Sequence, residues 1–123
     1  MLTICDCLHA AETVTPTPTL SSPNGVARSP VTVSFNLPTN ALAGSVLVTF
    51  AVVSGIDHSS PHVLTLVASQ SSAGSHSFSF DSNGFLSSAV SSVSSGGSQV
   101  KALVSNCTYS VSLSYRDWLA NPA

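Results

Sequence analysis

A carboxylate and two imidazoles fall within the six residues "DHSSPH", at Asp57, His58 and His62. Such side chains can ligate zinc or another divalent ion. Histidines four residues apart face one another on a helix, whereas Pro61 and the intervening serines favour a loop. We therefore expect this stretch to be a solvated loop, and we predict no metal site.

Serine makes up about a fifth of the chain, so combinations of serine, histidine and aspartate occur by chance and do not by themselves indicate a catalytic triad. No serine lies in the Gly-x-Ser-x-Gly pattern that exposes a nucleophile between a strand and a helix. The stretch "SSGGS" lacks the Gly-Lys-Ser/Thr ending of a phosphate-binding loop. The sequence therefore predicts no catalytic residue and no cofactor, and we expect the protein not to be an enzyme.

Three aspartates and one further histidine could also take part in binding. Asp57, Asp81 and Asp117 are too widely spaced for a calcium loop, so only convergence of Asp57 with Asp117 could build such a site. His76 alternates with Phe78 and Phe80, which places it on an apolar strand face. We expect it to be a satisfied histidine at the boundary of the core.

The three cysteines are Cys5, Cys7 and Cys107. Cys5 and Cys7 are separated by one residue, which is too close for an easy mutual disulfide. The interpretation we favour is unconstrained thiols in the tail. A bridge from Cys107 to one of the tail cysteines is the alternative.

Length and composition limit the class of protein. The 123 residues suffice for one domain with a modest core. Charged residues are 7% of the chain, against roughly 25% in a typical soluble domain, and the net charge is −2. This balance argues against a nucleic-acid partner, and no apolar run is long enough to insert in a membrane. A hydroxyl-rich, weakly charged surface favours an extracellular location. The N-terminus makes a poor secretion signal, so we expect the chain to be a fragment.

The elements that must position these groups are predicted to be short β-strands. Residues 1–16 are expected to form a disordered or irregular tail, and the Pro/Thr-rich residues 12–30 a linker that runs into a short edge strand. Period-two alternation predicts strands at 31–37, 75–81 and 109–115, and apolar runs predict strands at 45–53 and 62–69. We expect a helical turn or irregular crossover from residue 83, and then a short strand around 98–104. Six or seven such strands favour an antiparallel β-sandwich.

Within the last of these strands, Leu103-x-x-Asn106-x-x-Tyr109 is followed by the alternating apolar residues Val111 and Leu113. This pattern resembles the E–F corner and F strand of fibronectin type III and related Ig-like domains. The resemblance implies that Asn106 occupies a left-handed turn position. It also implies a tyrosine corner, in which the hydroxyl of Tyr109 bonds to backbone upstream.

The next residues, "YRDWLANPA", resemble the Tyr-x-Asp-x-x-Gly-Asn-Pro loop of many Ig-like repeats. The matching positions are Tyr115, Asp117, Asn121 and Pro122, whereas Ala120 replaces the glycine. The resemblance covers roughly residues 28–123. It implies that the sandwich domain, which we expect over residues 17–123, is fibronectin type III-like and lacks its final strand. The strand formed by 109–115 would then lie exposed at a sheet edge.

Such repeats occur in large extracellular and cell-surface proteins. The resemblance therefore implies a non-catalytic structural or adhesive module, a spacer or cohesion repeat. Its partners would be neighbouring repeats, another surface protein or a glycan. The alternative is a carbohydrate- or glycoprotein-binding module that uses the loop of Trp118 and Leu119 together with His58 and His62. Asn106-Cys107-Thr108 is a formal glycosylation sequon on the predicted turn.

Overall fold

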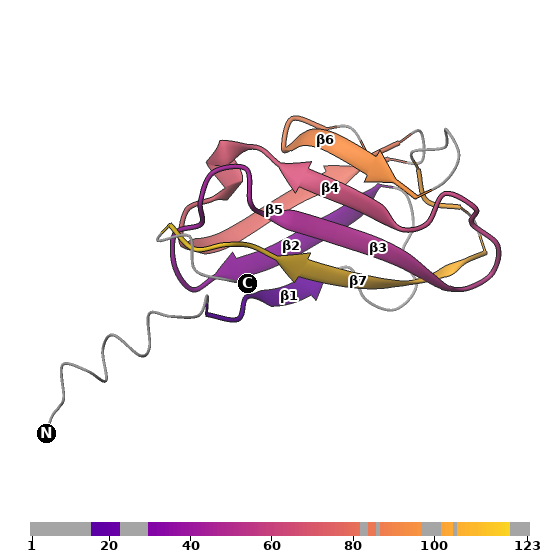
Figure 1. Cartoon of the computed structure of the whole chain (residues 1–123), viewed down its shortest axis with the longest axis horizontal. Helices are drawn as coiled ribbons and strands as arrows, with labels where there is room; N and C mark the ends of the chain where they lie inside the picture. Colours follow the sequence, from indigo (N-terminus) through magenta and orange to yellow (C-terminus); the bar gives the residue numbers. More distant parts are fainter. Residues whose placement is uncertain are drawn as a thin grey trace, which may run out of the picture.

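The computed structural model describes residues 16–22, 30–81, 84–85, 87–96, 102–104 and 106–118. Within them the chain forms seven strands and one short 3-10 helix (Figure 1). The elements are β1 (Thr19–Ser22), β2 (Val31–Leu37), β3 (Leu47–Ser54), β4 (His62–Leu66), η1 (Ala68–Gln70), β5 (Gly74–Phe80), β6 (Val90–Ser95) and β7 (Thr108–Ser114).

The strands form two sheets that lie face to face. One sheet has the order β1-β2-β5 and the other the order β6-β4-β3-β7, and every pairing of neighbours is antiparallel. The prediction of an all-β antiparallel sandwich is confirmed, and the topology is consistent with an Ig-like or fibronectin type III-like domain. β7 is an edge strand of its sheet, as far as the described residues extend. The missing final strand stays a prediction.

The core fills the space between the two sheets with the residues that alternate inward. Phe50 on β3 is 1% exposed, and its ring lies 5.7 Å from that of Phe80, 5.6 Å from Phe85 and 6.4 Å from Tyr109, measured between ring centroids. Aromatic pairs at these separations add to the stabilisation that apolar burial provides. One face of β3 is buried and the other only half-buried, so this central strand is covered less completely than its apolar sequence suggests.

Serines take the outward positions of the strands, and they pair across the sheet. On β2 and β5 the hydroxyls of Thr32 and Ser79 lie 3.0 Å apart, and those of Ser34 and Ser77 lie 3.1 Å apart. Each hydroxyl can donate once and accept twice, so these pairs leave capacity for water. The outer face of this sheet is therefore hydrophilic without carrying charge.

The structure departs from the sequence prediction between β5 and β7. Residues 90–95, expected in a helical turn or irregular crossover, form strand β6, which pairs with β4. The serines that disfavour a helix suit the solvent side of an edge strand, while Val90 and Val93 turn toward the core. Of the strand predicted around 98–104, the described residues 102–104 are not β-structure, and the others lie outside the described residues.

No helix in the described ranges is long and apolar enough to cross a membrane.

Candidate functional site: a buried polar network at one end of the sandwich

Four side chains form a continuous hydrogen-bonded network at one end of the two sheets. Nε2 of His62 lies 2.8 Å from Oδ2 of Asp57, and Nδ1 of the same ring lies 2.8 Å from Oγ of Ser95. The hydroxyl of Tyr109 donates to the same carboxylate oxygen at 2.5 Å. The network thus joins β4, β6 and β7 to the loop that contains Asp57.

The loop between β3 and β4 folds back to bring Asp57 to His62. Oδ1 of Asp57 accepts a hydrogen bond from the backbone N–H of Ser59 at 2.9 Å, which closes a tight turn. Farther along, the hydroxyl of Ser60 accepts from the N–H of Val52 at 2.8 Å and holds the loop against the end of β3. Ser60 precedes Pro61 through a cis peptide bond.

His62 is fully buried, which corrects the prediction that it belongs to a solvated loop. Its exposed fraction is 0%, and its ring centroid lies 5.0 Å from that of Phe85 and 6.4 Å from that of Tyr109. The alternation with Leu64 and Leu66 along β4 places His62 on the core side, and this signal outweighs the polar residues that precede it. His58 is exposed, as expected.

Electrostatics define the donors and acceptors of the network. Burial raises the pKa of Asp57, but the hydrogen bonds from Tyr109, His62 and the N–H of Ser59, together with the charge of His62, hold it below its ordinary value of 3.8. Asp57 is therefore ionised at neutral pH. Burial and the bond to Asp57 raise the pKa of Tyr109, so its phenol stays protonated and donates. Since a carboxylate only accepts, Nε2 of His62 must carry a proton toward Asp57.

Nothing in this geometry gathers a metal ligand set. Asp57 and His62 are paired with one another, and in the described ranges no three histidine, cysteine or acidic residues come together in a way that could hold an ion. Asp117 lies at the other end of the sandwich, where it bridges to Ala41 beside Trp118. Asp57 and Asp117 therefore do not converge, and the calcium site that their convergence would build is excluded.

The residues that match the E–F corner of fibronectin type III domains lie close to one another. Asn106 is exposed and has a φ of 63°, in the left-handed region, and the hydroxyl of Tyr109 accepts a hydrogen bond from the N–H of Val104 at 2.9 Å. Leu103, Val111 and Leu113 are partly buried and pack against the core cluster. The corner thus shares its tyrosine with the buried network.

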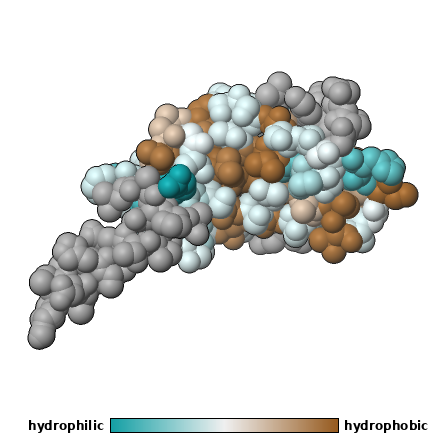
Figure 2. All heavy atoms as spheres, in the orientation of Figure 1, coloured by the Kyte–Doolittle hydropathy of each residue, from teal (hydrophilic) through white to brown (hydrophobic). Residues whose placement is uncertain are grey.

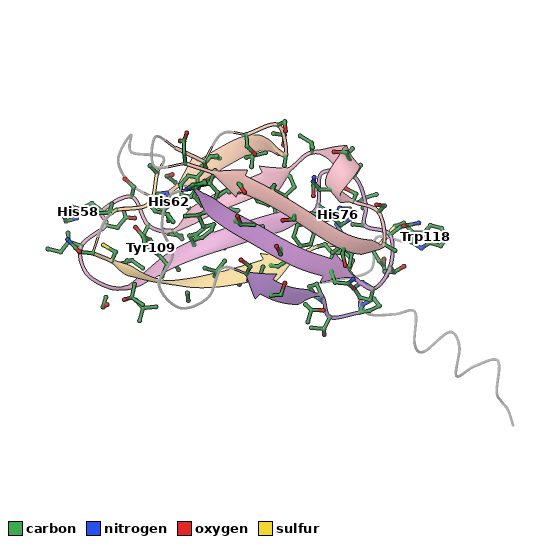
Figure 3. The ribbon with its side chains drawn as sticks, turned by 180° about the vertical axis from the view of Figure 1, so that it is seen from behind. His58, His62, His76, Tyr109 and Trp118 are labelled. Atoms are coloured by element: carbon green, nitrogen blue, oxygen red, sulfur yellow. The ribbon has the colours of Figure 1, made fainter. Side chains whose placement is uncertain are left out.

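Trp118 lies at the opposite end of the molecule from His58, and both side chains point outward (Figure 3). Its exposed fraction is 59%. A shared binding site of Trp118 with His58 and His62 is therefore wrong, because the body of the sandwich separates them. Leu119 lies outside the described residues.

The remaining candidates have ordinary environments. His76 stacks on Phe35 with ring centroids 5.2 Å apart, and its Nε2 lies 2.6 Å from the carbonyl oxygen of Ser72. Cys107 is half-buried, forms no disulfide within the described residues, and its Sγ lies 3.5 Å from the carbonyl oxygen of Ile56. Cys5 and Cys7 lie outside the described residues, so a bridge to Cys107 stays untested.

The sequence interpretation missed Ser95 and the burial of the Asp57–His62 pair. The phase of His62 along its strand carried a signal for burial. Ser95 had no such sequence signal, because it reaches His62 only through the cross-strand register of β4 and β6.

No family model, curated protein or solved structure matches the chain.

Proposed function

We propose that the chain is a non-catalytic structural module of a larger extracellular or cell-surface protein, and that it acts as a spacer or cohesion repeat. The observation that carries this proposal is the placement of exposed apolar side chains. The large ones among the described residues are Leu42, Val53, Ile56 and Trp118. Leu42 pairs with the backbone beside Trp118, and Val53 and Ile56 precede His58 in the chain. Trp118 and His58 lie at opposite ends of the molecule (Figure 3).

The first pair is held by a short antiparallel bridge. Ala41 pairs with Asp117, while the N–H of Leu42 donates to the carbonyl of Arg116 at 2.8 Å and the N–H of Trp118 to that of Asn40 at 2.9 Å. Ala41 and Asp117 turn inward, so their neighbours Leu42 and Trp118 turn outward diagonally across the bridge. Leu42 is 41% exposed and Trp118 59%.

The second pair lies beside the buried network, with Val53 near the end of β3 and Ile56 on the loop that follows the strand. Val53 is 68% exposed and Ile56 72%. Gly55 between them approaches the backbone of the turn at Asn106 and Cys107 so closely that a Cβ there would lie 3.0 Å from the carbonyl oxygen of Asn106. The backbone at Gly55 therefore packs against this turn, while the side chains of Val53 and Ile56 face solvent. Hydrophobic surface is visible at both ends of the long axis (Figure 2).

An apolar pair at each end suits end-on contact between successive modules. Contact between unlike ends is heterologous and propagates into rows, whereas contact between like ends stops at a dimer. The low charge density leaves little repulsion between copies. The hydroxyl of Tyr115 also donates to the carbonyl of Pro16 at 2.8 Å, so Pro16 lies at the Trp118 end, where an upstream neighbour would dock.

Mixing two variants blocked at different ends tests the proposal. One carries Leu42→Ser and Trp118→Ser, and the other Val53→Ser and Ile56→Ser. In sedimentation velocity over increasing concentration, the wild type should self-associate, each variant should stay monomeric, and the equimolar mixture should form dimers through the two intact ends. A monomeric wild type at millimolar concentration, or a variant that still dimerises, would overturn the end-on contact.

One observation favours a second candidate, a saccharide-binding module. An indole exposed to this degree on a turn offers the flat apolar face on which a sugar ring stacks. Binding on a glycan array that Trp118→Ala abolishes, with Leu42→Ala unaffected, would favour this function. Retention of binding in Trp118→Ala would exclude it.

A further inference from the structure

The buried network ends at a serine hydroxyl near the surface. Asp57 and His62 are buried, whereas Ser95 is half-buried and is the last residue of β6. The order of contacts is carboxylate, imidazole, hydroxyl, with both links at 2.8 Å. A nucleophile and a base within hydrogen-bond reach, with the base oriented by a third group, is the arrangement that activates a serine. We propose that Ser95 is an activated nucleophile toward acyl and phosphonyl electrophiles.

The tautomer of His62 gives the hydroxyl its acceptor. Asp57 takes the proton-bearing Nε2, so in the neutral ring Nδ1 holds a lone pair, and the Ser95 hydroxyl lies 2.8 Å from that nitrogen. Ser95 must then donate to Nδ1. Proton transfer along this bond creates an imidazolium beside a carboxylate that Tyr109 and the N–H of Ser59 hold in its charged form. The ring cannot rotate freely because Phe85 packs against it.

The reaction balances without any further reagent. With a fluorophosphonate, the bond from Oγ of Ser95 to phosphorus forms, the phosphorus–fluorine bond breaks, fluoride leaves, and the hydroxyl proton passes to Nδ1 of His62 and from there to solvent. With an activated ester, the bond from Oγ of Ser95 to the acyl carbon forms and the ester bond from that carbon to the alkoxy oxygen breaks. Ser95 is left acylated, and the alcohol departs with the proton that His62 received.

The adjacent backbone sets a limit on this chemistry. The N–H of Gly96, which follows Ser95, is already bonded to the carbonyl of Ser59 at 2.7 Å. It is therefore not available to stabilise an oxyanion, a contribution worth about 10² to 10³ in rate where it exists. We therefore expect Ser95 to react once with an electrophile and to stay modified, rather than to turn over substrate rapidly. This inference is independent of the end-on contacts proposed above.

Peptide mass spectrometry after treatment with a fluorophosphonate tests the proposal on the intact wild type. Ser94 and Ser92 lie exposed on the same strand and serve as internal controls, because no histidine in the described part of the chain is bonded to either of them. Modification should concentrate on Ser95 and should disappear when the protein is unfolded in urea. Modification spread evenly over the three serines, or absent from Ser95, would overturn the proposal.

Variants then locate the source of the reactivity. General-base catalysis contributes about 10² to 10⁴, so His62→Gln should lower the rate constant for labelling of Ser95 about 100-fold or more. Asp57→Asn should lower it too, and Ser94→Ala should leave it unchanged. Circular dichroism identifies any variant that has lost its fold. Undiminished labelling in a folded His62→Gln variant would show that the imidazole is not the base.

Discussion

The phenol oxygen of Tyr109 lies 2.5 Å from Oδ2 of Asp57, a contact that joins residues 52 positions apart in the sequence. The same hydroxyl accepts the N–H of Val104. One side chain therefore satisfies both a buried carboxylate and the backbone of the corner that precedes β7. The buried network and the corner form one structural unit.

Removal of this hydroxyl should be costly. Tyr109→Phe loses a bond to a charged group and leaves a backbone N–H without its partner, so we expect the free energy of unfolding to fall by about 2–4 kcal/mol. Tyr115→Phe is the matched control, because its hydroxyl only donates to the carbonyl of Pro16, and it should cost about 0.5–1.5 kcal/mol. Urea denaturation measures both values. Equal losses in the two variants would contradict the shared role of Tyr109.

Acid should remove the contribution of Asp57. The pKa of this carboxyl in the folded state is held below 3.8, so its stabilisation is fully present above that pH and is lost as the pH falls through the folded value. Urea denaturation of the wild type and of Asp57→Asn from pH 7 to pH 2 should show a gap in unfolding free energy at pH 5 to 7. The gap should narrow below about pH 3.8. A gap that stays constant down to pH 2 would show that the charge of Asp57 is not what stabilises the fold.

Gly55 should not tolerate a side chain. Its φ is 91°, and an added Cβ would lie 2.8 Å from Sγ of Cys107. Gly44 has a similar φ of 81° with nothing within 4 Å of the Cβ position. Gly44→Ala should therefore cost about 1 kcal/mol from backbone strain alone, and Gly55→Ala about 2–4 kcal/mol because crowding is added. Thermal unfolding compares the two, and equal melting temperatures would refute the close approach of the loop and the turn.

Asn106 should carry a glycan when the chain passes through a eukaryotic secretory pathway. It is exposed, and the sequon continues to Thr108 at the start of β7. We expect a mass increase that an amidase specific for N-glycans removes and that Thr108→Val abolishes. Secreted protein of unmodified mass would contradict the prediction. A glycan here would stand next to Val53 and Ile56, because Gly55 contacts the turn at Asn106.

The sequence predicts the fold well where each strand buries one face. Alternation locates β2, β5 and β7 to within about a residue, since inward side chains must recur at every second position. It says less about pairing: β6 is recognisable only once the free edge of β4 is known. The candidate site depends on that pairing, because Ser95 meets His62 through register alone. Asp57 depends on a loop conformation that local composition does not specify.

The bond between Tyr115 and Pro16 has a mechanical consequence. It places the first and last described segments at the same end of the sandwich. A pulling force applied at Pro16 and Trp118 would load the hydrogen bonds of β1 and β7 one after another, as in opening a zipper, rather than all at once in shear. β1 pairs with β2 and β7 with β3, each along one side in the described part of the chain. A domain stretched between these two points should therefore yield at low force.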